Sequence, residues 1–260
     1  MRNKILLSTD TMVWYGLDII FDMAKQCWFT GIDLAISKWF DAWNENYVQS
    51  LVKKYELPVY SVQTSSLLNT KEMNKVLDLC EKTDCDLITI NAPKFFDFKS
   101  YSFISNNIST YQSQNPALHF AIINPEDTNI FALPIPAYRF SNIVDIIKKY
   151  GCNLALDISN MNSEDLEGTF INKLDEFAPY LWVVYVSDKS KEGKTHLLPW
   201  EWILKLPTFF RKIKKAWYLR PFSVKLNLTK EELADSDKIE LLLTKAREYI
   251  EKYSEEENAV

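Results

Sequence analysis

The chain has 260 residues, and its content of 47% hydrophobic and 14% aromatic residues is enough to bury a sizeable core. Its formal net charge of −5 argues against nucleic-acid binding, because affinity for phosphates comes largely from clustered lysine and arginine. No stretch approaches the roughly 18 apolar residues of a membrane span, and polar residues follow the first apolar run too soon for a signal peptide. The composition therefore predicts a cytoplasmic protein without nucleic-acid or membrane partners.

Short apolar runs alternate along the chain with longer segments whose apolar residues recur every three or four positions. That alternation indicates parallel strands joined by helices. The predicted strands are Ile5–Thr9, Gly31–Ala35, Val59–Gln63, Leu87–Asn91, His119–Asn124, Asn153–Asp157, Leu181–Ser187 and Phe222–Asn227. Most of them are continuous apolar runs, which is typical of strands covered on both faces.

The segments between these runs carry helix signals. Apolar stripes at helical spacing run through Val48/Leu51/Val52/Tyr55, Met73/Val76/Leu77/Cys80, Ile143/Ile146/Ile147/Tyr150 and Ile239/Leu242/Leu243/Ala246/Ile250. Gly151 follows the third stripe, where a left-handed C-cap is expected, and Thr229 to Glu232 has the form of a capping box. The acidic tail, residues 251–260, is predicted to be a frayed helix end.

Eight strand–helix units predict a single (β/α)8 barrel over residues 1–260, since such a barrel needs about 250 residues. A doubly wound open sheet has the same local alternation, but usually about five or six strands and often a glycine-rich first turn. The turn after the first predicted strand, Ser8 to Tyr15, contains no glycine, and no Pro/Gly/Ser-rich linker divides the chain. The barrel is therefore favoured as the fold.

The four cysteines are Cys27, Cys80, Cys85 and Cys152. They lie in apolar or helical segments and lack the C-x-x-C spacing of a zinc site. We expect them to be buried apolar side chains in a reducing compartment.

Several segments resemble the xylose isomerase-like barrel family, which includes sugar isomerases, sugar epimerases and apurinic endonucleases. The similar segments run nearly end to end: Trp28–Leu34 is similar to the "G-F-x-G-I-E-L" second strand, Leu57–Gln63 to the third strand, Ala155–Asp157 to "L-x-L-D", Val184–Asp188 to "V-H-L-S-D" and His196–Pro199 to "H-x-P-x-G-x-G". The resemblance implies an active site at the carboxyl ends of the strands.

The same resemblance implies where a metal ion would bind. In the epimerases of the family the ligands are Glu, Asp, His and Glu at the ends of strands five to eight, and the corresponding positions here are Ile123, Asp157, Tyr185 and Lys225. A divalent cation needs several converging donors, whereas Ile123 donates nothing and Lys225 carries a positive charge. With two histidines in the whole chain, the trinuclear zinc site of the endonucleases cannot be assembled either. No metal ligands and no cofactor are therefore predicted.

Alternation along the strands predicts a polar ring at this end of the barrel. If Asp157, Tyr185 and Lys225 point inward, the residues two positions away on strands seven and eight, Ser187, Ser223 and Asn227, do so as well. Strands two to four add Asp33, Gln63 and Asn91. Because a buried ammonium group needs a carboxylate partner, we expect Lys225 to pair with Asp157 or Asp33. Lys225 then forms a structural salt bridge or binds an anionic or carbonyl ligand.

The loops after the strands are rich in aromatic residues, namely Trp14, Tyr15, Trp39, Phe40, Trp43, Phe95, Phe96, Phe98, Trp200 and Trp202. Their rings can stack on a sugar, fill a vacated pocket or form a protein interface. Trp200, Glu201 and Trp202 stand where the family has a flexible "G-x-G". This exchange predicts that side chains cover or plug the mouth of the barrel, which is the end formed by the carboxyl ends of the strands.

The leading interpretation is a barrel that has lost the metal-dependent chemistry of the family and binds a small sugar-like or phosphorylated ligand, or serves as an interaction protein. The predicted ligand-binding residues are Asp33, Gln63, Asn91, Tyr185, Ser187, Asn227, Trp14, Trp39, Trp200 and Trp202. The alternative is a sugar or sugar-phosphate isomerase or epimerase with a rearranged acid/base site, and only this alternative calls for a divalent metal. Its candidate catalytic residues are Asp157, Lys225, His196, Asp188 and Glu201. His119, at the start of strand five, is predicted to be structural.

Overall fold

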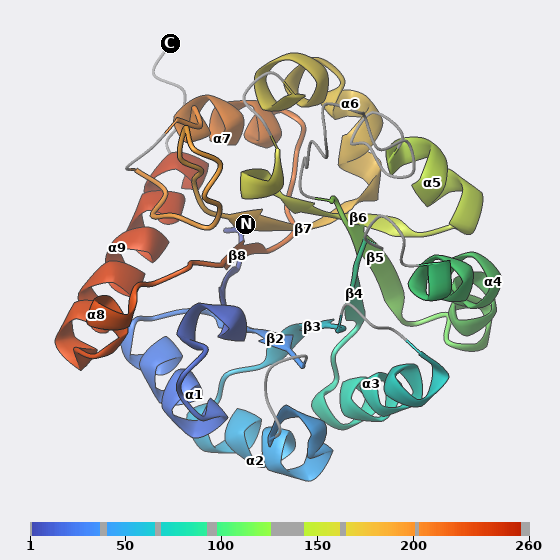
Figure 1. Cartoon of the computed structure of the whole chain (residues 1–260), viewed down its shortest axis with the longest axis horizontal. Helices are drawn as coiled ribbons and strands as arrows, with labels where there is room; N and C mark the ends of the chain where they lie inside the picture. Colours follow the sequence, from blue (N-terminus) through green and yellow to red (C-terminus); the bar gives the residue numbers. More distant parts are fainter. Residues whose placement is uncertain are drawn as a thin grey trace.

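The computed structural model of the protein describes residues 2–36, 41–65, 69–92, 98–125, 143–161, 165–200 and 203–255. Eight parallel strands close into a barrel in chain order, and the helices lie around it (Figure 1). The predicted (β/α)8 fold is therefore confirmed. The strands are β1 (Ile5–Ser8), β2 (Gly31–Ala35), β3 (Val59–Gln63), β4 (Leu87–Asn91), β5 (His119–Ile123), β6 (Asn153–Asp157), β7 (Leu181–Val186) and β8 (Phe222–Val224).

The helices are α1 (Leu17–Gln26), α2 (Glu45–Tyr55), α3 (Thr70–Thr83), α4 (Phe98–Gln114), α5 (Ile143–Tyr150), α6 (Leu174–Phe177), α7 (Leu206–Lys215), α8 (Lys230–Leu233) and α9 (Ser236–Glu255). The four predicted apolar stripes lie in α2, α3, α5 and α9. Thr229 and Glu232 form the predicted capping box, and Gly151 has the expected positive φ of 66°. Because α9 continues to Glu255, the first half of the acidic tail is helical, and the rest lies outside the described residues.

Strands β2, β3, β4 and β6 have the predicted bounds, whereas β1, β5, β7 and β8 end one to three residues early. The reason is that, at the carboxyl ends of these strands, side chains replace neighbouring strands as hydrogen-bond partners of the backbone. The Thr9 hydroxyl accepts from the Ala35 N–H at 2.9 Å, and the Thr11 hydroxyl accepts from the Leu226 N–H at 3.0 Å. After β5, the Asn124 amide bonds both the N–H and the carbonyl of Asp157.

Two apolar layers alternate along each strand. Inside the barrel lies a small cluster that includes Val183 and Tyr185, while Val184 and Val186 belong to the large core between strands and helices. All four cysteines are buried and free, as predicted. Within the described ranges, no helix combines the length and apolar character needed to cross a bilayer. The polar side chains of interest therefore come from inward-facing positions at the carboxyl ends of the strands.

Candidate functional site

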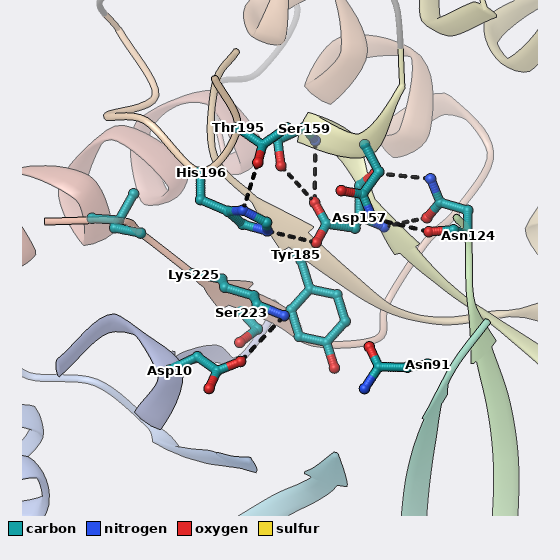
Figure 2. Close-up of polar contacts among 12 residues, drawn as sticks. Asp10, Asn91, Asn124, Asp157, Ser159, Tyr185, Thr195, His196, Ser223 and Lys225 are labelled. Carbon is teal, nitrogen blue, oxygen red and sulfur yellow. Dashed lines mark hydrogen bonds and ion pairs between the residues drawn. The ribbon is translucent and has the colours of Figure 1, made fainter. Parts of the chain in front are cut away.

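The Lys225 ammonium group lies at the carboxyl end of the barrel, just beyond β8, with its side chain 12% exposed. Its Nζ is 3.5 Å from Asp10 Oδ2 and 5.0 Å from the centroid of the Tyr185 ring (Figure 2). It also lies 3.3 Å from Gln63 Oε1. The prediction that Asp157 or Asp33 would be its ion-pair partner is wrong. Those two carboxyl groups feel its charge, but Asp10 forms the pair.

Asp10 is a site residue that the sequence prediction missed. It lies in the 3-10 turn Thr9–Met12, directly after β1. β1 pairs with β8, with Leu7 opposite Val224, so the residues that follow these two strands meet at the mouth. In any closed barrel the first and last strands are neighbours, and this rule was the available signal for an acid after β1 beside a lysine after β8.

Asp157, at the end of β6, has both carboxylate oxygens engaged by the protein. Its Oδ2 lies 2.9 Å from His196 Nε2, and its Oδ1 accepts from the N–H and hydroxyl of Ser159 at 3.2 and 2.8 Å. Burial raises the pKa of Asp157, but the charge and hydrogen bond of His196, together with the charge of Lys225, outweigh it and lower the pKa to about 2. Asp157 is therefore an ionised and fully partnered carboxylate at neutral pH.

The loop after β7 presents His196 to Asp157. Asp188 and Leu197 exchange backbone hydrogen bonds of 2.8 and 3.0 Å, and the Asn227 N–H donates to the His196 carbonyl at 2.6 Å. His196 itself has a φ of 60°, a conformation that costs a non-glycine residue on the order of 1 kcal/mol. The other ring nitrogen, Nδ1, is 3.1 Å from the Thr195 hydroxyl oxygen. The imidazole is thus held by contacts on both of its nitrogens.

Two predicted site residues have other positions or roles. The Asp188 carboxylate accepts from the backbone N–H groups of Lys189 and Leu204, at 2.7 and 3.0 Å, and so organises the loop after β7. Asn227 is an exposed residue, and its backbone N–H donates to the His196 carbonyl. The strand β8 itself ends at Val224, three residues earlier.

A buried polar layer lies deeper in the barrel. The Tyr185 hydroxyl is 3.0 Å from the Thr89 hydroxyl oxygen and donates to Asp33 Oδ1 at 3.4 Å. Asp33, which is fully buried, also accepts from the hydroxyls of Ser61 and Ser223. Burial raises the pKa of the Asp33 carboxyl, against the opposing hydrogen bond of Ser61 and the charge of Lys225. Ionised Asp33 is therefore a source of instability at neutral pH.

We expect the Asp33→Asn variant to be more stable than the wild type at pH 7 to 8, by about 1 kcal/mol. The folded-state pKa of Asp33 is raised, so its contribution to stability declines as pH rises above its unfolded pKa of about 3.9. An asparagine cannot ionise and removes that decline. Urea unfolding between pH 4 and pH 8 measures this decline in the wild type and in Asp33→Asn, with the exposed Asp78→Asn variant as control. Equal loss of stability at every pH would contradict this expectation.

The structure brings several predicted ligand-binding residues together. The Gln63 amide donates to Asn91 Oδ1 at 3.3 Å, and the Asn91 amide donates to the Thr64 carbonyl at 2.9 Å, so both lie beside Lys225 and Tyr185. The predicted tryptophans do not form part of this group as far as they are described. Trp14 is 71% exposed, and Trp200 packs against Tyr249 of α9 at a centroid distance of 6.0 Å. Trp39, Glu201 and Trp202 lie outside the described residues.

The donor set at the mouth does not fit a divalent cation. Among the residues that the structure describes, no three His, Cys, Asp or Glu side chains lie close enough together to hold a metal ion. At the four positions implied by the family resemblance, Ile123 is apolar, Tyr185 is hydrogen bonded to Thr89, Lys225 is a cation and both oxygens of Asp157 are engaged. The site is therefore a set of paired charges and amides.

At the opposite end of the barrel, His119 has a structural position. Its ring lies 3.6 Å from that of Trp182, and the Arg220 guanidinium lies 3.6 Å from the same indole. Arg220 also lines a shallow pocket of about 400 Å³ between the loops that precede β7 and β8. This arrangement agrees with the prediction that His119 is remote from the mouth.

No family model matches the chain, and no curated protein matches it significantly. Solved structures do match. A xylose isomerase domain protein from Alicyclobacillus acidocaldarius is 13% identical, with 98% of this chain and 100% of that chain covered and a TM-score of 0.73. A xylose isomerase domain-containing protein from Salmonella typhimurium is 13% identical, with 95% of this chain and 97% of that chain covered and a TM-score of 0.74. The 3-keto-D-glucoside 4-epimerase of Escherichia coli is 13% identical, with 94% of this chain and 100% of that chain covered and a TM-score of 0.67. The fold is therefore that of the xylose isomerase-like barrels.

Proposed function

We propose that the carboxyl end of the barrel binds a small, neutral, sugar-like ligand without the help of a metal ion. The observation that carries this proposal is the placement of Lys225, whose ammonium group is held above the Tyr185 ring by Asp10 and Gln63. An ammonium group has three N–H donors, and two acceptors from the protein surround this one. Among the residues that the structure describes no third acceptor bonds this group, so one donor is left for an oxygen atom of the ligand.

The balance of charge favours a neutral ligand over a phosphorylated one. The charge of Lys225 is matched by Asp10, and Asp157 is an anion beside His196. A phosphate would bring about two negative charges to a site where the charge of Lys225 is already paired and Asp157 is an anion. The likeness in fold to an epimerase that acts on a 3-keto-glucoside supports a sugar-like ligand.

Isothermal titration calorimetry with D-glucose, D-fructose, a methyl 3-keto-glucoside and the 6-phosphates of the first two tests the proposal. We expect a neutral sugar to bind and its phosphate to bind more weakly. Lys225→Met should weaken binding at least about tenfold, since it removes a charged hydrogen-bond donor. The control Lys191→Met, on the exposed part of the loop after β7, should bind as the wild type does. Binding of none of the sugars, or its loss on adding a chelator, would refute the proposal.

A second candidate function is metal-independent isomerisation or epimerisation, favoured by the Asp157–His196 pair. Asp157 fixes one nitrogen of the imidazole, and the other nitrogen contacts only the hydroxyl of the adjacent Thr195 among the described residues. A base held in this way can move a proton next to a carbonyl group. Incubating the panel ketoses with the protein in D2O and following deuterium uptake by NMR separates the two functions. Uptake that disappears in His196→Gln supports the enzyme, and binding without uptake supports a binding protein.

A further inference from the structure

Ser187, directly after β7, carries a hydroxyl group without a partner. The side chain is fully buried, and its Oγ has no hydrogen-bond partner among the residues that the structure describes. Buried hydroxyls are nearly always hydrogen bonded, because leaving one unpaired costs the free energy of its desolvation. An alanine would avoid this cost. The presence of serine therefore calls for a partner that the described residues do not supply.

The position of Ser187 places that hydroxyl in the candidate site. Tyr185 belongs to the cluster inside the barrel and Val186 to the outer core, so alternation turns Ser187 inward, one layer nearer the mouth than Tyr185. Val186 lies opposite Val224 in the β7–β8 register, which sets Ser187 beside Lys225. The next residue, Asp188, bonds Leu197 and brings His196 back to the same end.

We propose that Ser187 is a specificity-determining contact of the ligand site, and that it shares one uncharged oxygen of the ligand with Lys225. This inference rests on the proposed function. A ligand hydroxyl or carbonyl oxygen has two lone pairs, so it can accept from the Lys225 ammonium and from the Ser187 hydroxyl at the same time. A ligand that lacks this oxygen leaves two donors unpaired, which is the strongest basis for discrimination that a polar site offers.

Substituting two serines of the same site should have opposite effects on the ligand-free protein. Ser159 is also fully buried, but its hydroxyl donates to Asp157 Oδ1 at 2.8 Å. We therefore expect Ser159→Ala to lower the melting temperature, whereas Ser187→Ala leaves it unchanged or raises it. A fall in melting temperature for Ser187→Ala as large as that for Ser159→Ala would overturn the inference, because it would reveal a structural partner.

Binding tests the second half of the inference, with D-fructose and its monodeoxy derivatives titrated by calorimetry. The wild type should bind one deoxy derivative at least about tenfold more weakly than D-fructose. Ser187→Ala should bind D-fructose about five- to twentyfold more weakly and should distinguish it less from that derivative. If the wild type binds and Ser187→Ala keeps both the affinity and the discrimination, this inference fails and the proposed function stands. If the wild type binds no sugar of the panel, the proposed function itself fails, and this inference fails with it.

Discussion

The Asp157→Ala variant is expected to lose about 3 kcal/mol of stability at pH 7, because it leaves several buried hydrogen-bonding groups without their acceptor. The substitution removes both acceptor oxygens that Ser159 and His196 use, and an anion whose field reaches Lys225. Urea unfolding followed by circular dichroism measures the loss. Wild-type stability in Asp157→Ala would show that these contacts do not hold the mouth together.

The same carboxylate predicts a pH window. Its pKa is about 2 in the folded protein against an ordinary value of 3.8, so its contribution to stability is present above about pH 4 and is lost as pH falls towards pH 2. The difference corresponds to about 2 kcal/mol. Asp157→Asn should remove this part of the acid dependence, and His196→Gln should move it to higher pH, because the pKa of Asp157 then returns towards its usual range. Urea unfolding of the wild type, Asp157→Asn and His196→Gln from pH 3 to pH 7 tests this expectation. The same dependence of the unfolding free energy on pH in all three proteins would contradict it.

The barrel itself could be predicted from the sequence because most strands are short apolar runs of the kind that is covered on both faces. Strand ends were harder to predict. The Asn124 amide and the Thr11 hydroxyl replace backbone partners at the mouth, and the sequence does not distinguish such side chains from ordinary strand residues. β8 ends at Val224, three residues before its predicted end at Asn227.

The candidate site was predictable as a set of positions, but its pairings were not. Gln63, Asn91, Tyr185 and Lys225 lie together because inward positions of neighbouring strands meet at one end of the barrel. The partner of Lys225 depends on which carboxylate its flexible side chain reaches, and closure of the barrel brings Asp10 nearest. The pairing of His196 with Asp157, 39 residues apart in the chain, depends on a loop held by the bridge between Asp188 and Leu197. Loop conformations of this kind leave no periodic signal in a sequence.

Gly31→Ala should be the most damaging of the small substitutions, with a loss of about 3 kcal/mol and a fall in melting temperature of about 10 °C. A Cβ at this first residue of β2 would lie 2.5 Å from Tyr60 Cδ2 and 2.6 Å from the Pro58 carbonyl oxygen. The Tyr60 ring can turn, but the Pro58 carbonyl accepts the Ile32 N–H at 2.9 Å and belongs to the backbone beside the irregular register at Ile32 and Asp33.

Relief of that clash has to move β2 against β3, and Asp33 moves with β2. We therefore expect Gly31→Ala also to disturb the hydrogen bond between the Ser61 hydroxyl and Asp33, and with it the polar layer beneath Lys225. Gly168→Ala is the matched control, since a Cβ there meets no atom within 4 Å. Differential scanning calorimetry of both variants provides the test. Equal melting temperatures for Gly31→Ala and Gly168→Ala would contradict the close approach of β2 and β3 and the site geometry that depends on it.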